Sequence, residues 1–182
     1  VTLPLARGPN RIEVEAQGRD GLLSVPALAE VVVPGHPRGA LYFLGFGVSK
    51  YARREYDLAY AHKDALDLAA ALRGLPGYER IHVHTWTDAQ VTPAAIQEAR
   101  SRLAGAGLED TVVVFVAGHG LYGPGPEARY YYLTHGAQLE RLAETAADFA
   151  LLEALVTDIT PRRKLLLIDT CESGERDPEE LT

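Results

Sequence analysis

The sequence predicts an α/β fold, in which a mostly parallel β-sheet is covered by helices on both faces. Two observations lead to this prediction. From residue 40 onward, short apolar runs alternate with segments whose apolar residues recur at helical spacing. The apolar runs are also continuous, as in Val112 to Val116, and strands that are apolar on both faces are typical of a sheet buried between helices.

Each element of this α/β part has its own local signal. The segment 59–74 has apolar residues at helical spacing and stops at Gly74. The segment 92–107 opens with Thr92 as the N-cap and Pro93 at the first helical position. Strands are expected over residues 40–48, 80–86, 111–118 and 163–171, helices over residues 59–74, 92–107 and 148–159, and a loop with a short strand over residues 120–133.

Residues 1–33 have a different pattern, because two alternating stretches flank a turn and no helical segment follows. Gly18 and Gly21 supply the turn, so a β-hairpin is expected. It looks like the last strands of an immunoglobulin-like β-sandwich, and the alternative is an edge hairpin of the main domain. The expected division is therefore a sandwich-like segment over 1–33, a linker over 34–39 and an α/β domain over 40–182.

Composition narrows the classes of partner. The 182 residues carry 18 basic and 25 acidic side chains, which gives a net charge of −7. Such a surface repels nucleic acid and anionic membranes, and no apolar run is long enough to span a bilayer. Cys171 is the only cysteine, which fits a reducing compartment such as the cytoplasm. Because methionine is absent, we expect the sequence to be a piece of a longer protein.

The chemistry of the sequence lies at the ends of two predicted strands. His119, between two glycines, follows one strand, and Cys171 follows another about 50 residues later, a spacing known from caspases. If the strands are neighbours, the imidazole can activate the thiol as a nucleophile. The amides of Gly120 and Cys171 can then hold an oxyanion. The alternative is a small buried cysteine and a hydrogen-bonded loop histidine.

These residues carry a resemblance to a known family. The stretches "DTVVVFVAGHG" and "KLLLIDTCESG" are similar to the caspase-like cysteine proteases, and most similar to the metacaspase and bacterial caspase-like branch. The Gln-Ala-Cys form of animal caspases is absent, since Asp169-Thr170 stands before the cysteine. The resemblance covers about residues 40–175. It implies a three-layer sandwich, with Cys171 as nucleophile and His119 as general base.

The resemblance also implies the substrate preference. It places Asp169 in the pocket for the residue before the scissile bond, and it maps a second family acid onto Asp64 in "KDA", although Lys63 replaces the usual Asn. Two carboxylates in one pocket would bind Arg or Lys of the substrate. The alternatives are a strand-end acid at Asp169 and an ordinary first-turn helix acid at Asp64.

The family has six strands in its sheet, whereas four are expected here. The chain therefore resembles the large subunit of such a protease, and its expected partner is the small subunit, a fragment from the C-terminal part of the same precursor. The predicted function is an endopeptidase that cleaves after Arg or Lys, with autoprocessing, a role in bacterial defence or cell death, and a gasdermin-like protein as one possible substrate. No cofactor is expected; calcium remains an option, because metacaspases often need it. The alternative is a catalytically silent scaffold.

Two histidines outside these motifs suggest another chemistry. His82 and His84 share one face of a predicted strand, as two ligands of a zinc ion would. A third ligand at a suitable spacing is not evident, so zinc is not expected.

Overall fold

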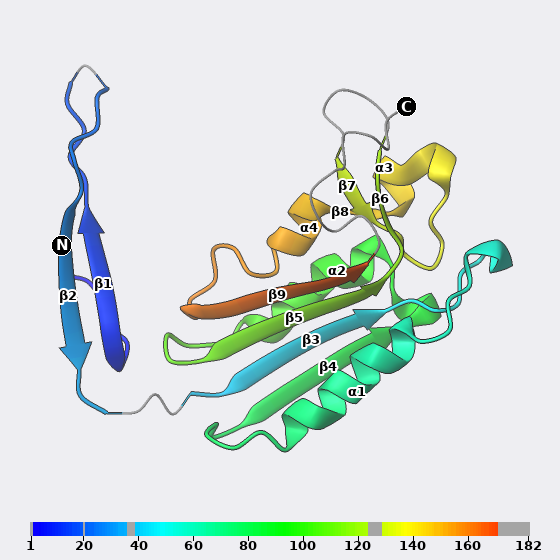
Figure 1. The fold of residues 1–182 in the computed structure, drawn as a ribbon, viewed down its shortest axis with the longest axis horizontal. Helices are drawn as coiled ribbons and strands as arrows, with labels where there is room; N and C mark the ends of the chain where they lie inside the picture. The colour runs from blue at the N-terminus through cyan, green and yellow to red at the C-terminus, as the bar shows by residue number, and fades with distance from the viewer. Residues whose placement is uncertain (1, 20, 36–38, 124–128, 171–182) are drawn as a thin grey trace.

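The structure, a computed structural model, describes residues 2–19, 21–35, 39–123 and 129–170. Its centre is a parallel four-stranded sheet with the order β4-β3-β5-β9 (Figure 1). The strands are β3 (Leu41–Gly47), β4 (Ile81–Thr87), β5 (Thr111–Gly118) and β9 (Arg163–Thr170). The predicted fold class and all four predicted strands are confirmed, and β5 and β9, which carry the two motifs, are neighbours.

Helices cover both faces of this sheet, so the domain has three layers (Figure 1). Helix α1 (Ala61–Arg73) packs its alanines against Phe43 and Phe115 on one face. On the other face, Ile96 of α2 (Pro93–Ala99) and Leu152 of α4 (Phe149–Glu153) lie in a core with Val114. Two apolar layers thus hold the sheet in place from both sides.

Two helices are shorter than predicted. The segment 92–107 begins as expected, since the Thr92 side chain accepts from the amide of Ala95, but α2 gives way to a 3₁₀ turn at Arg100–Leu103. The segment 148–159 forms only α4, and Asp158 has a positive φ of 52°. Arg100 contributes to this ending, because its guanidinium donates to the carbonyls of Ala154 and Asp158, and in a longer helix the carbonyl of Ala154 would accept from the amide of Asp158 instead.

A second, antiparallel sheet stands beside the carboxyl ends of β5 and β9 (Figure 1). It consists of β6 (Gly120–Tyr122), β7 (Tyr130–Tyr132) and β8 (Ala147–Asp148) in that order. The sequence predicted a loop and one short strand here, so the pairing into a sheet is new information. The remaining short elements are η1 (Arg54–Tyr56), η2 (Asp88–Gln90), η4 (Leu139–Arg141) and α3 (Leu142–Thr145).

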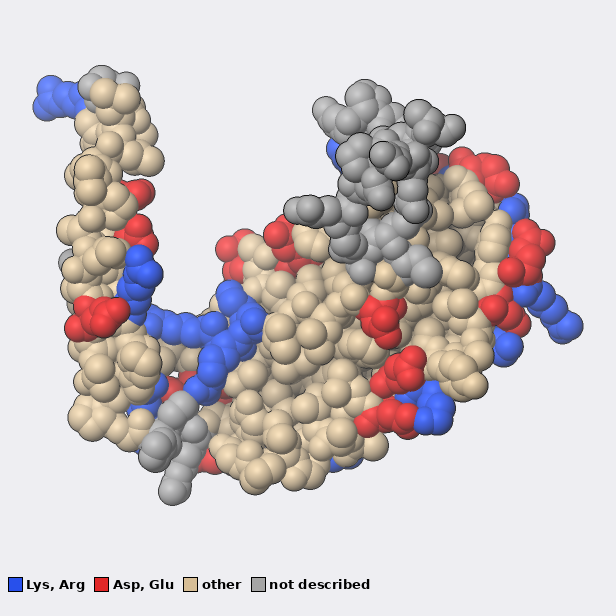
Figure 2. Space-filling view, in the orientation of Figure 1, with Lys and Arg blue, Asp and Glu red and all other residues tan. Residues whose placement is uncertain are grey.

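The N-terminal hairpin is present as a separate two-stranded sheet of β1 (Gly8–Val14) and β2 (Ala27–Val33) (Figure 1). Basic side chains gather where it approaches the α/β domain (Figure 2). Arg162 donates to the side chain of Asn10 at 2.6 Å and to the carbonyl of Pro4 at 2.7 Å. Since neither β1 nor β2 pairs with the four-stranded sheet, the hairpin is not an edge of that sheet, and its place in a β-sandwich stays a prediction.

No helix among the described residues is both long enough and apolar enough to cross a membrane.

Candidate active site

The two predicted catalytic positions follow adjacent strand ends. In the parallel register of β5 and β9, Gly118 lies beside Thr170. His119 comes directly after the first of these residues and Cys171 directly after the second. Cys171 lies outside the described residues, so the structure gives its approach through β9 and not its side chain. Parallel neighbours are about 4.8 Å apart, and the register therefore delivers both motifs to one edge of the sheet.

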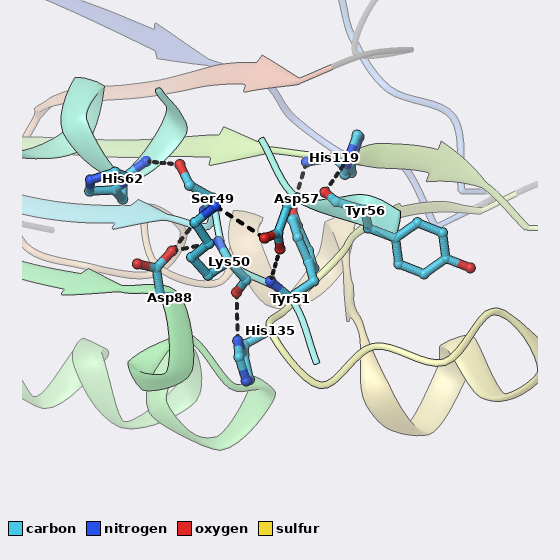
Figure 3. Close-up of polar contacts among 9 residues, drawn as sticks. All are labelled: Ser49, Lys50, Tyr51, Tyr56, Asp57, His62, Asp88, His119 and His135. Carbon is cyan, nitrogen blue, oxygen red and sulfur yellow. Dashed lines mark hydrogen bonds and ion pairs between the residues drawn. The ribbon is translucent and has the colours of Figure 1, made fainter. Parts of the chain in front are cut away.

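His119 is held by a hydrogen bond at its backbone and another at its ring (Figure 3). Its amide donates to the hydroxyl of Tyr51 at 3.0 Å, and its Nε2 lies 2.9 Å from the carbonyl oxygen of Tyr56. A carbonyl only accepts, so Nε2 must carry the proton of this bond. In the neutral imidazole, Nδ1 is then the nitrogen with a free lone pair, and it is the one able to take a proton from a nucleophile.

Tyr51 contributes a buried phenol to this arrangement. Burial of the side chain raises its pKa to about 12, and the nearby charge of Asp88 adds to the effect. The amide of His119 opposes the shift, because a hydrogen bond to the oxygen favours the phenolate. Tyr51 therefore stays neutral, and its hydroxyl oxygen accepts from His119 without adding a negative charge to the site.

Gly118 permits this contact. Its φ is +150°, which side chains rarely adopt, and a Cβ placed there would lie 2.9 Å from the hydroxyl of Tyr51 and 3.3 Å from the carbonyl oxygen of Val48. Any larger residue would therefore push Tyr51 away from the backbone of His119.

Gly120, the predicted oxyanion-hole residue, lies at the start of β6 with its backbone close to the end of β9. The amide of Leu133 donates to the carbonyl of His119, so Gly120 and Tyr132 form the next, non-hydrogen-bonded pair of the β6–β7 ladder. The Gly120 amide thus points away from β7. A Cβ on Gly120 would lie 2.8 Å from Oγ1 of Thr170, which shows how closely this backbone approaches the residue before Cys171.

The two predicted pocket acids come together from distant parts of the chain. Asp64, in the first turn of α1, and Asp169, near the end of β9, both line a cavity of about 380 Å³. Asp64 is half-buried and Asp169 is exposed. The other described lining residues are Leu58, Ala59, Tyr60, Ala61, Ala117, Gly118 and Thr170. Since the charged members of this set are both acids, the cavity suits a cation.

Lys63, the residue that departs from the family pattern, forms its ion pair away from the cavity that Asp64 and Asp169 line. Its ammonium group forms an ion pair with Asp67, one turn further along α1. The pair lies on the exposed side of the helix, whereas Asp64 lines the cavity. The substitution of Asn by Lys therefore does not neutralise Asp64 through a direct ion pair.

The histidines of β4 have structural contacts. The ring of His82 stacks on Tyr42 with centroids 4.6 Å apart, and the ring of His84 lies 6.3 Å from that of Trp86. Burial, followed by the charge of Arg102, lowers the pKa of His84. Across the described part of the chain, no group of three or more His, Cys, Asp or Glu side chains is placed to hold a metal ion.

Sequence reasoning missed the residues that hold His119. Tyr51 and Tyr56 lie in an irregular segment between β3 and α1, where no periodicity marks them. Their partner is more than 60 residues away in the chain. The one sequence signal for Tyr51 was that it closely follows the strand over residues 40–48, which lies in the part of the chain that the resemblance covers.

The comparisons with known proteins agree with the fold. The family model of the caspase domain matches residues 43–182. None of the curated proteins matches the chain. Among solved structures, a crystal structure of a protein from Geobacter sulfurreducens, a structural genomics target, is similar with a TM-score of 0.57 and 21% identity. The similarity covers 75% of this chain and 52% of that one, so the chain spans about half the length of this neighbour, and at this identity it concerns the fold.

Proposed function

The chain belongs to the caspase domain family, a family of cysteine peptidases, and on that premise we propose that it is an endopeptidase whose catalytic dyad is His119 and Cys171. The observation that carries the proposal is the hydrogen bond between Nε2 of His119 and the carbonyl of Tyr56. It leaves Nδ1 as the basic nitrogen on a histidine that follows the strand next to β9. A histidine with a merely structural role would not be expected to follow the strand that lies beside the strand leading to the cysteine.

The proposed reaction follows from these positions. Nδ1 of His119 takes the proton of the Cys171 thiol, and the thiolate attacks the carbonyl carbon of the scissile peptide bond. The amides of Gly120 and Cys171 stabilise the oxyanion that forms. The C–N bond then breaks, and the imidazolium of His119 protonates the departing amine, which leaves a thioester on Cys171. Water, deprotonated by His119, attacks the thioester and releases the carboxylic acid and the thiol.

We propose Arg or Lys as the substrate residue before the scissile bond. The support is the cavity shared by Asp64 and Asp169, because two carboxylates attract a cation and repel an acidic side chain. An Arg guanidinium can also bond a carboxylate through two parallel N–H groups, which Lys cannot. The cavity adjoins Thr170, so an occupied pocket brings the scissile bond to the residue that follows.

We also propose that a small-subunit fragment of the same precursor, released by autoprocessing, completes the sheet beside β9. Within the described residues β9 pairs with β5 alone, so the other edge of residues 163–169 can offer its backbone N–H and C=O groups to a further strand. Leu165 on this strand is 48% exposed. A partner strand would satisfy the backbone groups and cover the leucine.

The biological setting belongs to the proposal as well. The lone cysteine suits the reducing cytoplasm. We propose that the enzyme cleaves a gasdermin-like protein there, in bacterial defence or regulated cell death. The resemblance to the bacterial caspase-like branch supports it.

The test is an assay of the complete protein with fluorogenic peptides that carry Arg, Lys or Asp before the scissile bond, with and without calcium. Cleavage after Arg and Lys should disappear in Cys171→Ala. In Asp64→Asn and Asp169→Asn, kcat/KM for these peptides should fall about 10- to 100-fold, because each change removes a charge-assisted hydrogen bond.

Asp67→Asn is the matched control, since Asp67 lies on the same helix as Asp64 but pairs with Lys63 outside the cavity. Equal losses in Asp67→Asn and Asp64→Asn would contradict the pocket. Cleavage after Asp would contradict the specificity. If no peptide is cleaved under any condition, the silent scaffold becomes the better interpretation.

A further inference from the structure

Both residues that hold His119 belong to one short segment. We call residues 49–58 the tyrosine loop, because it contains Tyr51 and Tyr56 (Figure 3). The Tyr51 hydroxyl fixes the backbone of His119 and the Tyr56 carbonyl fixes its ring. The loop itself is irregular apart from one 3₁₀ turn, η1, so regular secondary structure does not account for its shape.

One carboxylate forms a cross-link inside this loop. Oδ1 of Asp57 accepts from the amide of Tyr51 at 3.0 Å, and Oδ2 forms an ion pair with Nζ of Lys50 at 3.0 Å. Asp57 is also the residue directly after Tyr56. The side chain thus ties the start of the loop to its end, and it joins the two residues that contact His119. The hydrogen bond from Tyr51, followed by that from Lys50, lowers the pKa of Asp57, so the carboxylate stays ionised.

The base of the loop is fixed to the scaffold independently. Oδ1 of Asp88 accepts from the amides of Ser49 and Lys50, both at 2.8 Å, and Asp88 holds a positive φ of 48° to do so. Nδ1 of His135 lies 2.6 Å from the carbonyl oxygen of Lys50 (Figure 3). The amide of Ala52 also donates to the carbonyl of His135 at 2.9 Å, and the amide of Leu58 donates to the carbonyl of Ser49 at 2.8 Å, which joins the two ends of the loop. These contacts fix the ends of the loop, and Asp57 links Tyr51 to the residue after Tyr56 within it.

We propose that Asp57 is a positioning residue for the peptidase reaction, which acts by linking Tyr51 to the Tyr56 end of the tyrosine loop so that the Tyr56 carbonyl meets Nε2 of His119. This inference rests on the proposed function, because it concerns the histidine of the proposed dyad. The described hydrogen bonds of Asp57 go to Tyr51 and Lys50, and not to His119 or to the cavity residues. Asp57 therefore acts on the position of His119 only through Tyr51 and Tyr56. A displacement of a catalytic group by about 1 Å can cost about 100-fold in rate.

Three substitutions separate geometry from charge at this position. Asp57→Ala removes the acceptor. Asp57→Glu keeps the charge but moves the carboxylate by one methylene, and Asp57→Asn keeps an acceptor oxygen at the original distance without the charge. Asp67→Ala is the control, since it also removes an exposed carboxylate that pairs with a lysine.

Two readouts distinguish positioning from a loss of fold. With an Arg peptide and the complete protein, kcat should fall about 10- to 100-fold in Asp57→Ala and Asp57→Glu with KM unchanged, while Asp57→Asn recovers most of the rate. The pH midpoint of Cys171 alkylation by iodoacetamide should rise in the first two variants, because a misplaced imidazole no longer stabilises the thiolate. Asp67→Ala should match the wild type in both measurements.

The outcomes are separable. If the wild type alkylates with the midpoint of an ordinary thiol, near about pH 8.5, the proposed dyad fails. If its midpoint is low but Asp57→Ala and Asp57→Glu retain both the midpoint and kcat, the role of Asp57 is overturned while the dyad stands. Should Asp57→Ala not fold, the comparison of Asp57→Glu with Asp57→Asn decides, and equal rates in these two overturn the inference.

Discussion

At the scale of the residue, Tyr51 shows how burial and function meet in a single hydroxyl. It accepts from the amide of His119, and burial keeps it neutral with a pKa of about 12. In the unfolded chain the pKa of tyrosine is about 10, so between pH 10 and 12 the unfolded state loses this proton while the folded state retains it. The folded state binds more protons in that window, and the free energy of unfolding therefore falls as the pH rises through it.

This difference predicts an alkaline loss of stability of about 3 kcal/mol from Tyr51 across that window. In Tyr51→Phe this part of the loss should be absent, so the free energy of unfolding in urea should depend less steeply on pH above 10. Tyr132, whose pKa burial also raises, remains in the variant and keeps its own contribution. Identical pH dependence in the wild type and in Tyr51→Phe would contradict the assignment.

At the scale of the element, the close approach of β3 to α1 places Asp64 in the cavity. A Cβ on Gly47, the last residue of β3, would lie 2.8 Å from the Cα of His62 and would also meet the carbonyl of Ala61. These are backbone atoms at the start of α1, so they can yield only if the helix moves. Ser49 adds a second link here, because its hydroxyl accepts from the amide of His62 at 2.9 Å.

Gly47→Ala should therefore displace the first turn of α1 and destabilise the domain by about 1–3 kcal/mol. It should also lower kcat/KM for Arg peptides, since Asp64 moves with the helix, whereas Gly136→Ala serves as the control because a Cβ there meets nothing within 4 Å. Thermal unfolding and peptide kinetics measure the two effects. If the Gly47→Ala protein is destabilised but keeps the same kcat/KM for Arg peptides, the position of α1 does not determine the preference for Arg.

The same scale shows what the sequence could predict. Short apolar runs that are rich in β-branched residues and bounded by turn residues favour strands, so the strands that end before His119 and Cys171 were predicted correctly, as was the start of α2 at Thr92. Helix α2 passes into a 3₁₀ turn earlier than predicted, and the predicted end of α4 was wrong because the guanidinium of Arg100 bonds the carbonyl of Ala154 in place of a helical amide. No local pattern contains such a contact. For the same reason the sequence could indicate His119 but not the carbonyl that orients it.

At the scale of the whole molecule, the hairpin and the candidate active site lie at opposite ends of the parallel strands (Figure 1). Asn10 is buried, and its side chain accepts from Arg162 just before β9 begins. The amide of Arg7 also donates to Glu109, which precedes β5. The hairpin is thus attached at the amino ends of the two strands whose carboxyl ends carry the motifs.

Arg162→Ala should free the hairpin without altering the domain. Faster hydrogen exchange is expected for amides of β1 and β2, and unchanged exchange for β3 and β5, which are buried between helices. Lys164→Ala, another exposed basic residue of the same segment, is the control. If exchange in the hairpin is the same in both variants, the Arg162 contacts do not hold it.

The location of Asp169 has a consequence for which basic side chains the proposed enzyme accepts. Asp169 pairs with Ala117 inside β9, which is paired with β5 along its whole length, and Asp169 stands two residues before Cys171 in the sequence. The proposed pocket acid and the proposed nucleophile therefore belong to one short stretch of backbone. Because Asp169 is held in a paired strand, it cannot move by itself to reach the cation of a shorter side chain, such as ornithine in place of arginine. We therefore expect the proposed enzyme to select substrates by the length of the basic side chain.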